Sequence, residues 1–216
     1  MKNKLISISI DDGHPLDLKA AEKLAKKNIQ TTFYIPIKNS TGRPTLNRKQ
    51  IKWLSQQPHF KIGGHTYNHV DLTKISLIVA EKEIVSGKEA LEDIIGEKIS
   101  TFAFPWGKYT RALVDIVNRL GFLDCRSATT LNLNEVNKSG FLWHPNLHIF
   151  PHPWYRGIVN ALIRKDIKTV RKRYILRDRG YIDLIQNIKQ MDMPIHFWFH
   201  SWEIEKIQMW NIIDNL

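Results

Sequence analysis

The sequence predicts an α/β fold, in which a parallel sheet carries its helices on the outside. Short apolar stretches rich in isoleucine, phenylalanine and threonine alternate along most of the chain with longer segments whose apolar residues recur at helical spacing. No internal repeat and no low-complexity linker interrupts the 216 residues, a length that one hydrophobic core can accommodate. We therefore expect a single domain over residues 1–216.

The first half of the chain supplies three predicted strands and two predicted helices. Residues 4–10 alternate in polarity, are rich in isoleucine and serine, and predict the first strand. Asp17 is suited to cap a helix that runs to about Lys27. Residues 31–36 predict the second strand, and Asn47 is suited to cap the next helix. The short apolar stretch 60–63 predicts the third strand.

The longest helical pattern covers residues 76–95, and Gly96 is well placed to end it. Strands are predicted at residues 101–104 and 122–126, with a helix at 110–120 between them.

Beyond residue 126 the pattern weakens, because three prolines make residues 129–154 irregular. Helical patterns return at 155–172 and 180–192, and the apolar run after Pro194 predicts the last strand. Residues 142–154 are rich in histidine, proline and aromatic side chains. They suit either a groove in which rings stack on a sugar or a loop packed over the sheet.

The net charge of +11 is concentrated in residues 156–179, which hold nine basic residues and two acidic ones. Such a cluster attracts anions. It suits either a solvated helix face or docking to an anionic glycan, an anionic lipid or a lipid-phosphate carrier at a membrane surface. The sequence contains no DNA- or RNA-reading motif, so we expect no nucleic-acid partner.

Cys125 is the only cysteine, so no disulfide can form within the chain. The N-terminal apolar stretch is shorter than that of a signal peptide, and no window approaches the ~20 apolar residues of a membrane span. These features predict a cytoplasmic protein, which the basic segment would bring to the inner membrane surface. The sequence does not indicate an oligomeric state.

Polar residues gather where the predicted strands end. Asp11 and Asp12 follow the first strand, and His65 and His69 follow the third. The ends of the later strands carry Pro105 and Trp106, Arg126, and His200. Ligand sites of parallel α/β folds lie at the carboxyl ends of the strands, so we expect these side chains to share one site.

The acidic pair and the two histidines suggest a metal site. An aspartate with two histidines, spaced as on one face of a helical turn, leaves coordination positions open for hydrolysis. The second aspartate is then available to take a proton from water. Each motif alone has an ordinary interpretation, as a turn or as a chance spacing; their common position at strand ends favours function.

The same residues match motifs of a known family. Residues 9–13 read SIDDG where the family has TFDDG, and residues 65–69 match the H-[ST]-x-x-H motif. Residues 102–107 read FAFPWG, close to the FAYPYG of one branch, and residues 199–202 fit the motif that ends in a strand histidine. The chain resembles the polysaccharide deacetylases, the NodB-homology group of carbohydrate esterase family four.

The resemblance implies a distorted (β/α) barrel with about seven parallel strands, fewer than the usual eight. It assigns the general base to Asp11, the metal to Asp12, His65 and His69, and the general acid to His200. The segment Pro105-Trp106 would stabilise the oxyanion, through the backbone N–H of Trp106. Trp198 and Trp202 would line the pocket for the acetyl group. The metal would be zinc, with cobalt, nickel or iron as alternatives.

Two departures from the family pattern need compensation. Ala103 stands where the commoner branch has an arginine beside the catalytic base, and we expect Arg126 to replace that cation. The fourth family motif has no clear counterpart. Asp183, Asp192 and Glu203 are therefore equal candidates for the group that orients His200.

The resemblance thus predicts a metal-dependent hydrolase that removes acetyl groups from an N-acetylated polysaccharide, oligosaccharide or lipid-linked glycan. The bond cleaved would be a non-peptide C–N amide, and related enzymes also cleave O-acetyl esters. The alternative is a catalytically silent barrel that binds glycans. Neither the sugar nor its linkage can be read from the sequence.

Overall fold

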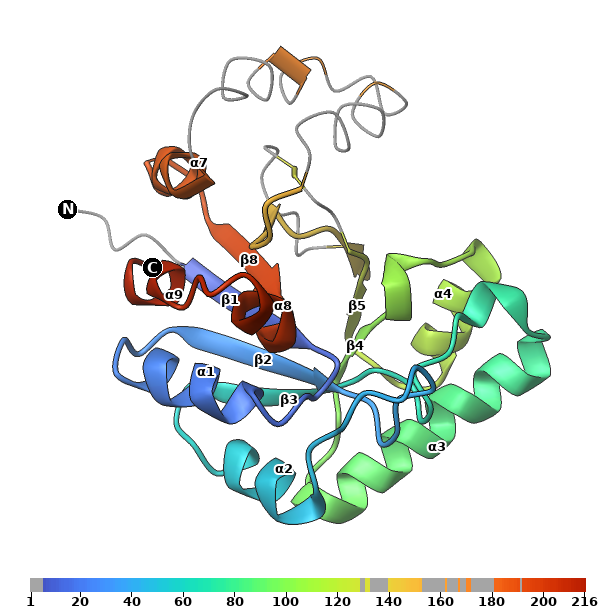
Figure 1. Ribbon diagram of the computed structural model, residues 1–216. Helices are drawn as coiled ribbons and strands as arrows, with labels where there is room; N and C mark the ends of the chain where they lie inside the picture. The colour runs from blue at the N-terminus through green and yellow to red at the C-terminus, as the bar shows by residue number, and fades with distance from the viewer. Residues whose placement is uncertain are drawn as a thin grey trace.

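Eight strands form one curved sheet in which every neighbouring pair runs parallel, in the order β6-β5-β4-β3-β2-β1-β8-β7 (Figure 1). The computed structural model describes residues 6–128, 131–132, 140–152, 162, 167, 170–171, 181–190 and 192–216. The expected α/β class and distorted barrel are confirmed, with eight strands in the described residues where about seven were expected.

The strands are β1 (Ile6–Asp11), β2 (Gln30–Ile35), β3 (Phe60–Gly64), β4 (Thr101–Ala103), β5 (Asp124–Arg126), β6 (Leu142–Trp143), β7 (Leu147–His148) and β8 (Ile195–Phe199). The α-helices are α1 (Asp17–Ala25), α2 (Arg48–Ser55), α3 (Leu77–Ile95), α4 (Arg111–Arg119), α7 (Tyr181–Lys189), α8 (Ser201–Lys206) and α9 (Asn211–Asp214). Two short 3₁₀ turns lie at Leu72–Lys74 and Pro105–Gly107. Helices α1 to α4 lie along the outer side of the sheet (Figure 1).

Local sequence signals mark the starts of α2, α3 and α4 and the end of α3. Asn47 and Gln50 form a reciprocal capping box at the start of α2. Ser76 caps α3, and Gly96 ends it with a left-handed φ of 75°. Thr110 caps α4.

The expected cap at Asp17 was wrong. The N-cap of α1 is Leu16, and Asp17 is the first helical residue. Its buried carboxyl accepts a hydrogen bond from the Ser201 hydroxyl instead. Burial raises the pKa of Asp17 well above its ordinary value, although this hydrogen bond opposes the shift. Asp17 thus contacts Ser201, from a distant part of the chain, instead of capping its own helix.

Departures from the predicted elements concentrate in the last third of the chain. The segment expected to be irregular contains β6 and β7, which are only two residues long and so carry too little sequence pattern to be recognised. Helices α8 and α9 were not predicted. Most of the expected helix 155–172 and of the basic segment 156–179 lies outside the described residues, so docking through that segment stays a prediction. No helix among the described residues is long and apolar enough to cross a membrane.

Strand β1 is an interior strand of the sheet, flanked by β2 and β8, and its Ile10 is in register with Phe33 of β2 and with Phe199 of β8. All three side chains are fully buried. The carboxyl end of β1 therefore has a strand on each side and apolar packing directly beneath it.

Helix α3 holds the loop that follows β3. The Tyr67 N–H donates to the Glu83 carbonyl at 3.0 Å, and the Glu83 carboxylate accepts from the Asn68 backbone and side chain at 2.9 and 2.7 Å. Gly87 lets α3 approach this loop closely, because a Cβ at that position would lie only 2.6 Å from the Thr66 carbonyl carbon. The loop that carries His65 and His69 is thus fixed against a rigid helix.

Gly87→Ala is expected to move this loop. Overpacking against backbone costs about 1–3 kcal/mol, which outweighs the helix propensity that alanine gains. We expect a lower urea midpoint and weaker zinc binding, measured by competition with a chromophoric chelator. Gly96→Ala, at the end of the same helix, should lower stability by about 1 kcal/mol through its positive φ without changing zinc affinity. Equal zinc affinity in Gly87→Ala and wild type would contradict the prediction.

Candidate active site

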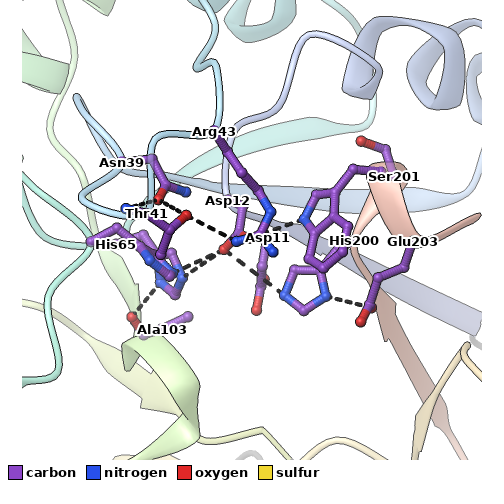
Figure 2. Close-up of polar contacts among 12 residues, drawn as sticks. Asp11, Asp12, Asn39, Thr41, Arg43, His65, Ala103, His200, Ser201 and Glu203 are labelled. Atoms are coloured by element: carbon purple, nitrogen blue, oxygen red, sulfur yellow. Dashed lines mark hydrogen bonds and ion pairs between the residues drawn. The ribbon is translucent and has the colours of Figure 1, made fainter. Parts of the chain in front are cut away.

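Strand β1 ends in a tight turn that directs its two acidic residues toward different partners. Asp12 and Gly13 both adopt left-handed backbone conformations, with φ of 78° and 59°. This region is uncommon for side-chain-bearing residues, although aspartate tolerates it better than most. The Asp11 carboxylate pairs with Arg126. The Asp12 carboxylate instead lies among imidazole rings (Figure 2).

The site converges on the Asp12 carboxylate. Its Oδ1 atom lies 2.9 Å from His69 Nε2, 3.7 Å from His65 Nε2 and 3.9 Å from His200 Nε2. Its Oδ2 atom accepts a hydrogen bond of 3.1 Å from Trp202 Nε1. Burial favours the neutral acid, but the histidines, His200 foremost, hold the pKa of Asp12 well below its ordinary value. Asp12 is therefore an anion buried within the protein.

The two histidines after β3 meet through a loop and not through the expected helical turn. Residues 65–69 lie outside any helix, and Thr66 and His69 have positive φ values of 67° and 54°. His65 Nδ1 donates to the Ala103 carbonyl oxygen at 2.7 Å. Because that carbonyl can only accept, the Nδ1 atom carries a proton, and Nε2 is the ring nitrogen that faces the cluster.

Asp12, His65 and His69 fit a divalent metal. One ligand atom from each lies within 4.8 Å of the others. Among the described residues, the buried Asp12 Oδ1 has no donor in hydrogen-bonding geometry, and such an unsatisfied acceptor costs about 1–3 kcal/mol. A cation would satisfy this oxygen, and one carboxylate with two imidazoles is a ligand set found in hydrolytic zinc sites.

Arg126 lies where the sequence predicted a substitute cation. It is the last residue of β5, fully buried, and its Nη2 donates to Asp11 Oδ1. Ala103, which stands where the family's commoner branch has arginine, is the register partner of Arg126 in the β4–β5 pair. The guanidinium lies over the Tyr34 ring at 4.6 Å, which packs it further. The positive charge that is absent at Ala103 of β4 is thus supplied by Arg126, its register partner on β5.

Glu203 is the carboxylate beside His200. Its Oε2 atom lies 2.6 Å from His200 Nδ1, whereas the other two candidates, Asp183 and Asp192, are exposed. Burial opposes protonation of His200, but Asp12 and Glu203 raise its pKa to about 9. Despite its own burial, Glu203 has a pKa lowered to about 2, because His148 and His200 both lie against it. Together Glu203 and His200 form an ion pair in the first turn of α8.

His148, on β7, was not selected from the sequence. Its Nε2 atom lies 3.0 Å from Glu203 Oε2, and its ring stacks on Trp198 with centroids 3.7 Å apart. The described part of the aromatic segment 142–154 supplies β6 and β7 to the sheet, and His148 and His152 line the cavity, so both interpretations of this segment stay predictions. The sequence signal that could have identified His148 is a second H-x-x-x-H spacing, formed with His152. In the structure, His148 Nδ1 lies 2.7 Å from His152 Nε2.

These groups open on one cavity of about 350 Å³. Its lining includes Asp11, Asp12, Arg43, His65, His69, Trp106, His148, His152, Trp198, His200, Trp202 and Glu203. Arg43 is a second residue that sequence reasoning missed, because it lies in a loop without a recognisable motif. The cavity brings together every predicted site residue except Arg126 and Pro105, which are buried and do not line it.

Trp106 stands at the rim of the cavity with a strained backbone. Its side chain is 54% exposed, its ring centroid lies 5.3 Å from that of His69, and its φ is 61°. A bulky residue in this region is a conformational outlier, and such strain gathers at functional sites. No acceptor for the Trp106 backbone N–H is found in the described part of the chain. This donor is therefore available to a ligand.

The fold and the site together define a distorted (β/α) barrel with an Asp-His-His cluster and a histidine–carboxylate pair at the strand ends. A sequence profile of the family described as polysaccharide deacetylase matches residues 1–123, more than half of the chain. The chain belongs to the polysaccharide deacetylase family, as its motifs predicted.

Individual relatives resemble parts of the chain. A peptidoglycan-N-acetylglucosamine deacetylase from Bacillus cereus is 27% identical over 105 residues, which are 48% of this chain and 36% of that protein. The regions that match curated relatives span 28% to 54% of those proteins.

Solved structures show the same fold. A family 4 carbohydrate esterase from Streptomyces lividans has a TM-score of 0.60 at 13% identity, covering 99% of this chain and 87% of that one. A pseudoenzyme of the same family from Bacillus anthracis has a TM-score of 0.56 at 14% identity, covering 100% of this chain and 62% of that one.

His69→Ala tests the metal site. We expect the wild-type chain to bind one zinc ion and to gain thermal stability from it, because a ligand that binds only the folded state stabilises that state. Loss of one ligand should weaken zinc binding, measured by calorimetric titration, by more than the roughly 10- to 100-fold typical of losing a residue that only hydrogen-bonds to a ligand. His59→Asn, at an exposed position with a φ of 68°, is the matched control. Equal zinc affinities for His69→Ala and wild type would reject this site.

Proposed function

We propose that this chain is a metal-dependent deacetylase that releases acetate from an N-acetylated sugar. The observation that carries the proposal is the convergence of three chemically distinct units on one cavity. They are the Asp11–Arg126 pair, the Asp12-His65-His69 cluster, and the His200–Glu203 pair. A base, a ligand set and an acid are the groups that hydrolysis of an amide requires.

Asp11 is the proposed base. Arg126 balances its charge and fixes one of its oxygens, so the carboxylate is presented to the cavity in one orientation. From there it accepts a proton from the water that attacks the acetyl carbonyl carbon. A divalent ion held by Asp12, His65 and His69 would supply a Lewis acid, which polarises carbonyl groups and makes water acidic near neutral pH.

The Trp106 N–H and His200 serve the two sites where charge develops. The N–H is positioned to donate to the carbonyl oxygen as that oxygen becomes negative. His200, protonated at neutral pH and held by Glu203, donates its Nε2 proton to the leaving amine. The rings of Trp198 and Trp202 give the cavity apolar walls suited to the acetyl methyl group. The products are acetate and a free amino sugar.

Acetate release decides between this function and a silent barrel. We expect the zinc-loaded wild type to release acetate from N-acetylhexosamine oligomers. Asp11→Asn should lower kcat/KM by about 10²–10⁴-fold, which is the rate acceleration that a general base typically contributes. Circular dichroism and zinc content control for folding, since the substitution leaves Arg126 buried without its carboxylate. O-acetylated sugars form a second substrate set. Zinc binding without acetate from any substrate would favour the silent, glycan-binding alternative.

Glu203→Gln tests whether Glu203 acts through His200. Removing this charge lowers the His200 pKa from about 9, so less of the acid form remains at alkaline pH. We expect the alkaline limb of the kcat/KM profile to move to lower pH, and kcat to fall about 10- to 100-fold. Glu205→Gln, in the same helix but paired with Lys19, should leave the profile unchanged. An unmoved alkaline limb in Glu203→Gln would show that Glu203 has only a structural role.

A further inference from the structure

Arg43 extends from the loop between β2 and α2 into the cavity wall (Figure 2). Its guanidinium carbon lies 4.0 Å from the centroid of the Trp202 ring. Its Nη1 atom donates to Thr41 Oγ1 at 2.9 Å, and that hydroxyl donates in turn to Asn39 Oδ1 at 2.6 Å. The side chain is half-buried and restrained from two sides, so its position in the cavity is largely preorganised.

Arg43 differs from the other charged groups of the site in having no counterion. In the described part of the chain, no carboxylate oxygen lies within 4.0 Å of its guanidinium, whereas Arg126 pairs with Asp11 and His200 with Glu203. Asp12 is unavailable to it, because its oxygens face Trp202 Nε1 and the histidines. The stack on Trp202 and the single bond to Thr41 leave most of the guanidinium donors unused.

The charge of the whole cavity supports the same conclusion. The Asp11–Arg126 and His200–Glu203 pairs are each neutral overall. The Asp12 charge would offset only part of a divalent ion. Arg43 therefore adds to a positive excess in the loaded cavity, and it lies beside the apolar ring of Trp202.

We propose that Arg43 forms an anion subsite, and that the substrate carries a carboxylate or phosphate on, or next to, its N-acetylated sugar. This inference rests on the proposed deacetylase function and narrows its substrate class. A planar guanidinium binds either oxyanion through paired N–H donors, and the Trp202 ring holds that plane in place. A neutral N-acetylated oligomer would fill the acetyl pocket but leave this charge unmatched.

The test compares matched substrates with and without the anion. N-acetylglucosamine 1-phosphate supplies the phosphate, N-acetylmuramic acid supplies the carboxylate, and N-acetylglucosamine is the neutral reference. We expect wild-type kcat/KM for at least one anionic sugar to exceed that for the neutral sugar by about tenfold or more. Arg43→Gln should lower this ratio by about 10- to 100-fold, the range expected for a lost charge-assisted hydrogen bond. The sugar that shows the effect identifies the anion.

Arg48→Gln is the matched control, because it removes the same charge from an exposed α2 position where Arg48 pairs with Asp93. It should leave the substrate ratio unchanged. A wild type without preference for either anion, or an equal ratio in Arg43→Gln and wild type, would overturn the proposal. Calorimetric binding of the same three sugars to wild type and Arg43→Gln gives a second readout that does not depend on turnover. Tighter binding of an anionic sugar, lost in Arg43→Gln, would support the subsite even if no acetate were released.

Discussion

The arrangement of this site depends on the burial of one carboxylate, that of Asp12. An anion at 3% exposure requires compensation from its surroundings, and here the compensation comes from elements far apart in sequence. The loop after β3 contributes His65 and His69, and α8 contributes Trp202. The same charge that would bind a metal therefore also ties the first, third and last strands of the barrel together at their carboxyl ends.

A second buried anion, Asp11, is compensated differently. Its partner Arg126 is itself fully buried, and removing either member of such a pair costs about 3–5 kcal/mol because the other is left uncompensated. The pair is supported from within the barrel. Tyr34, which lies against the Arg126 guanidinium, is hydrogen-bonded to Thr101, whose hydroxyl donates to Asp124. A chain of polar groups thus continues from the site into the interior of the barrel.

Periodicity predicted the elements that are long enough to show it, and motifs predicted which residues meet. The two-residue strands β6 and β7 carry no readable period, so they were missed. The helical turn predicted for residues 65–69 was wrong, because the conformation of this loop is determined by Glu83 and Gly87, which lie well outside it. The choice of Glu203 for His200, and the role of Arg43, depend on distances that spacing along the chain does not contain.

The position of β1 between β2 and β8 has a consequence for how the chain folds. Its neighbour β8 follows it by almost the whole length of the chain, so the edge of β1 that pairs with β8 stays open until the last strand arrives. Contacts of such long sequence separation form slowly, and an unpaired apolar edge is prone to pair with another chain. His200 enters the cavity only when β8 docks. Assembly of the cavity and pairing of the open edge of β1 are therefore the same event.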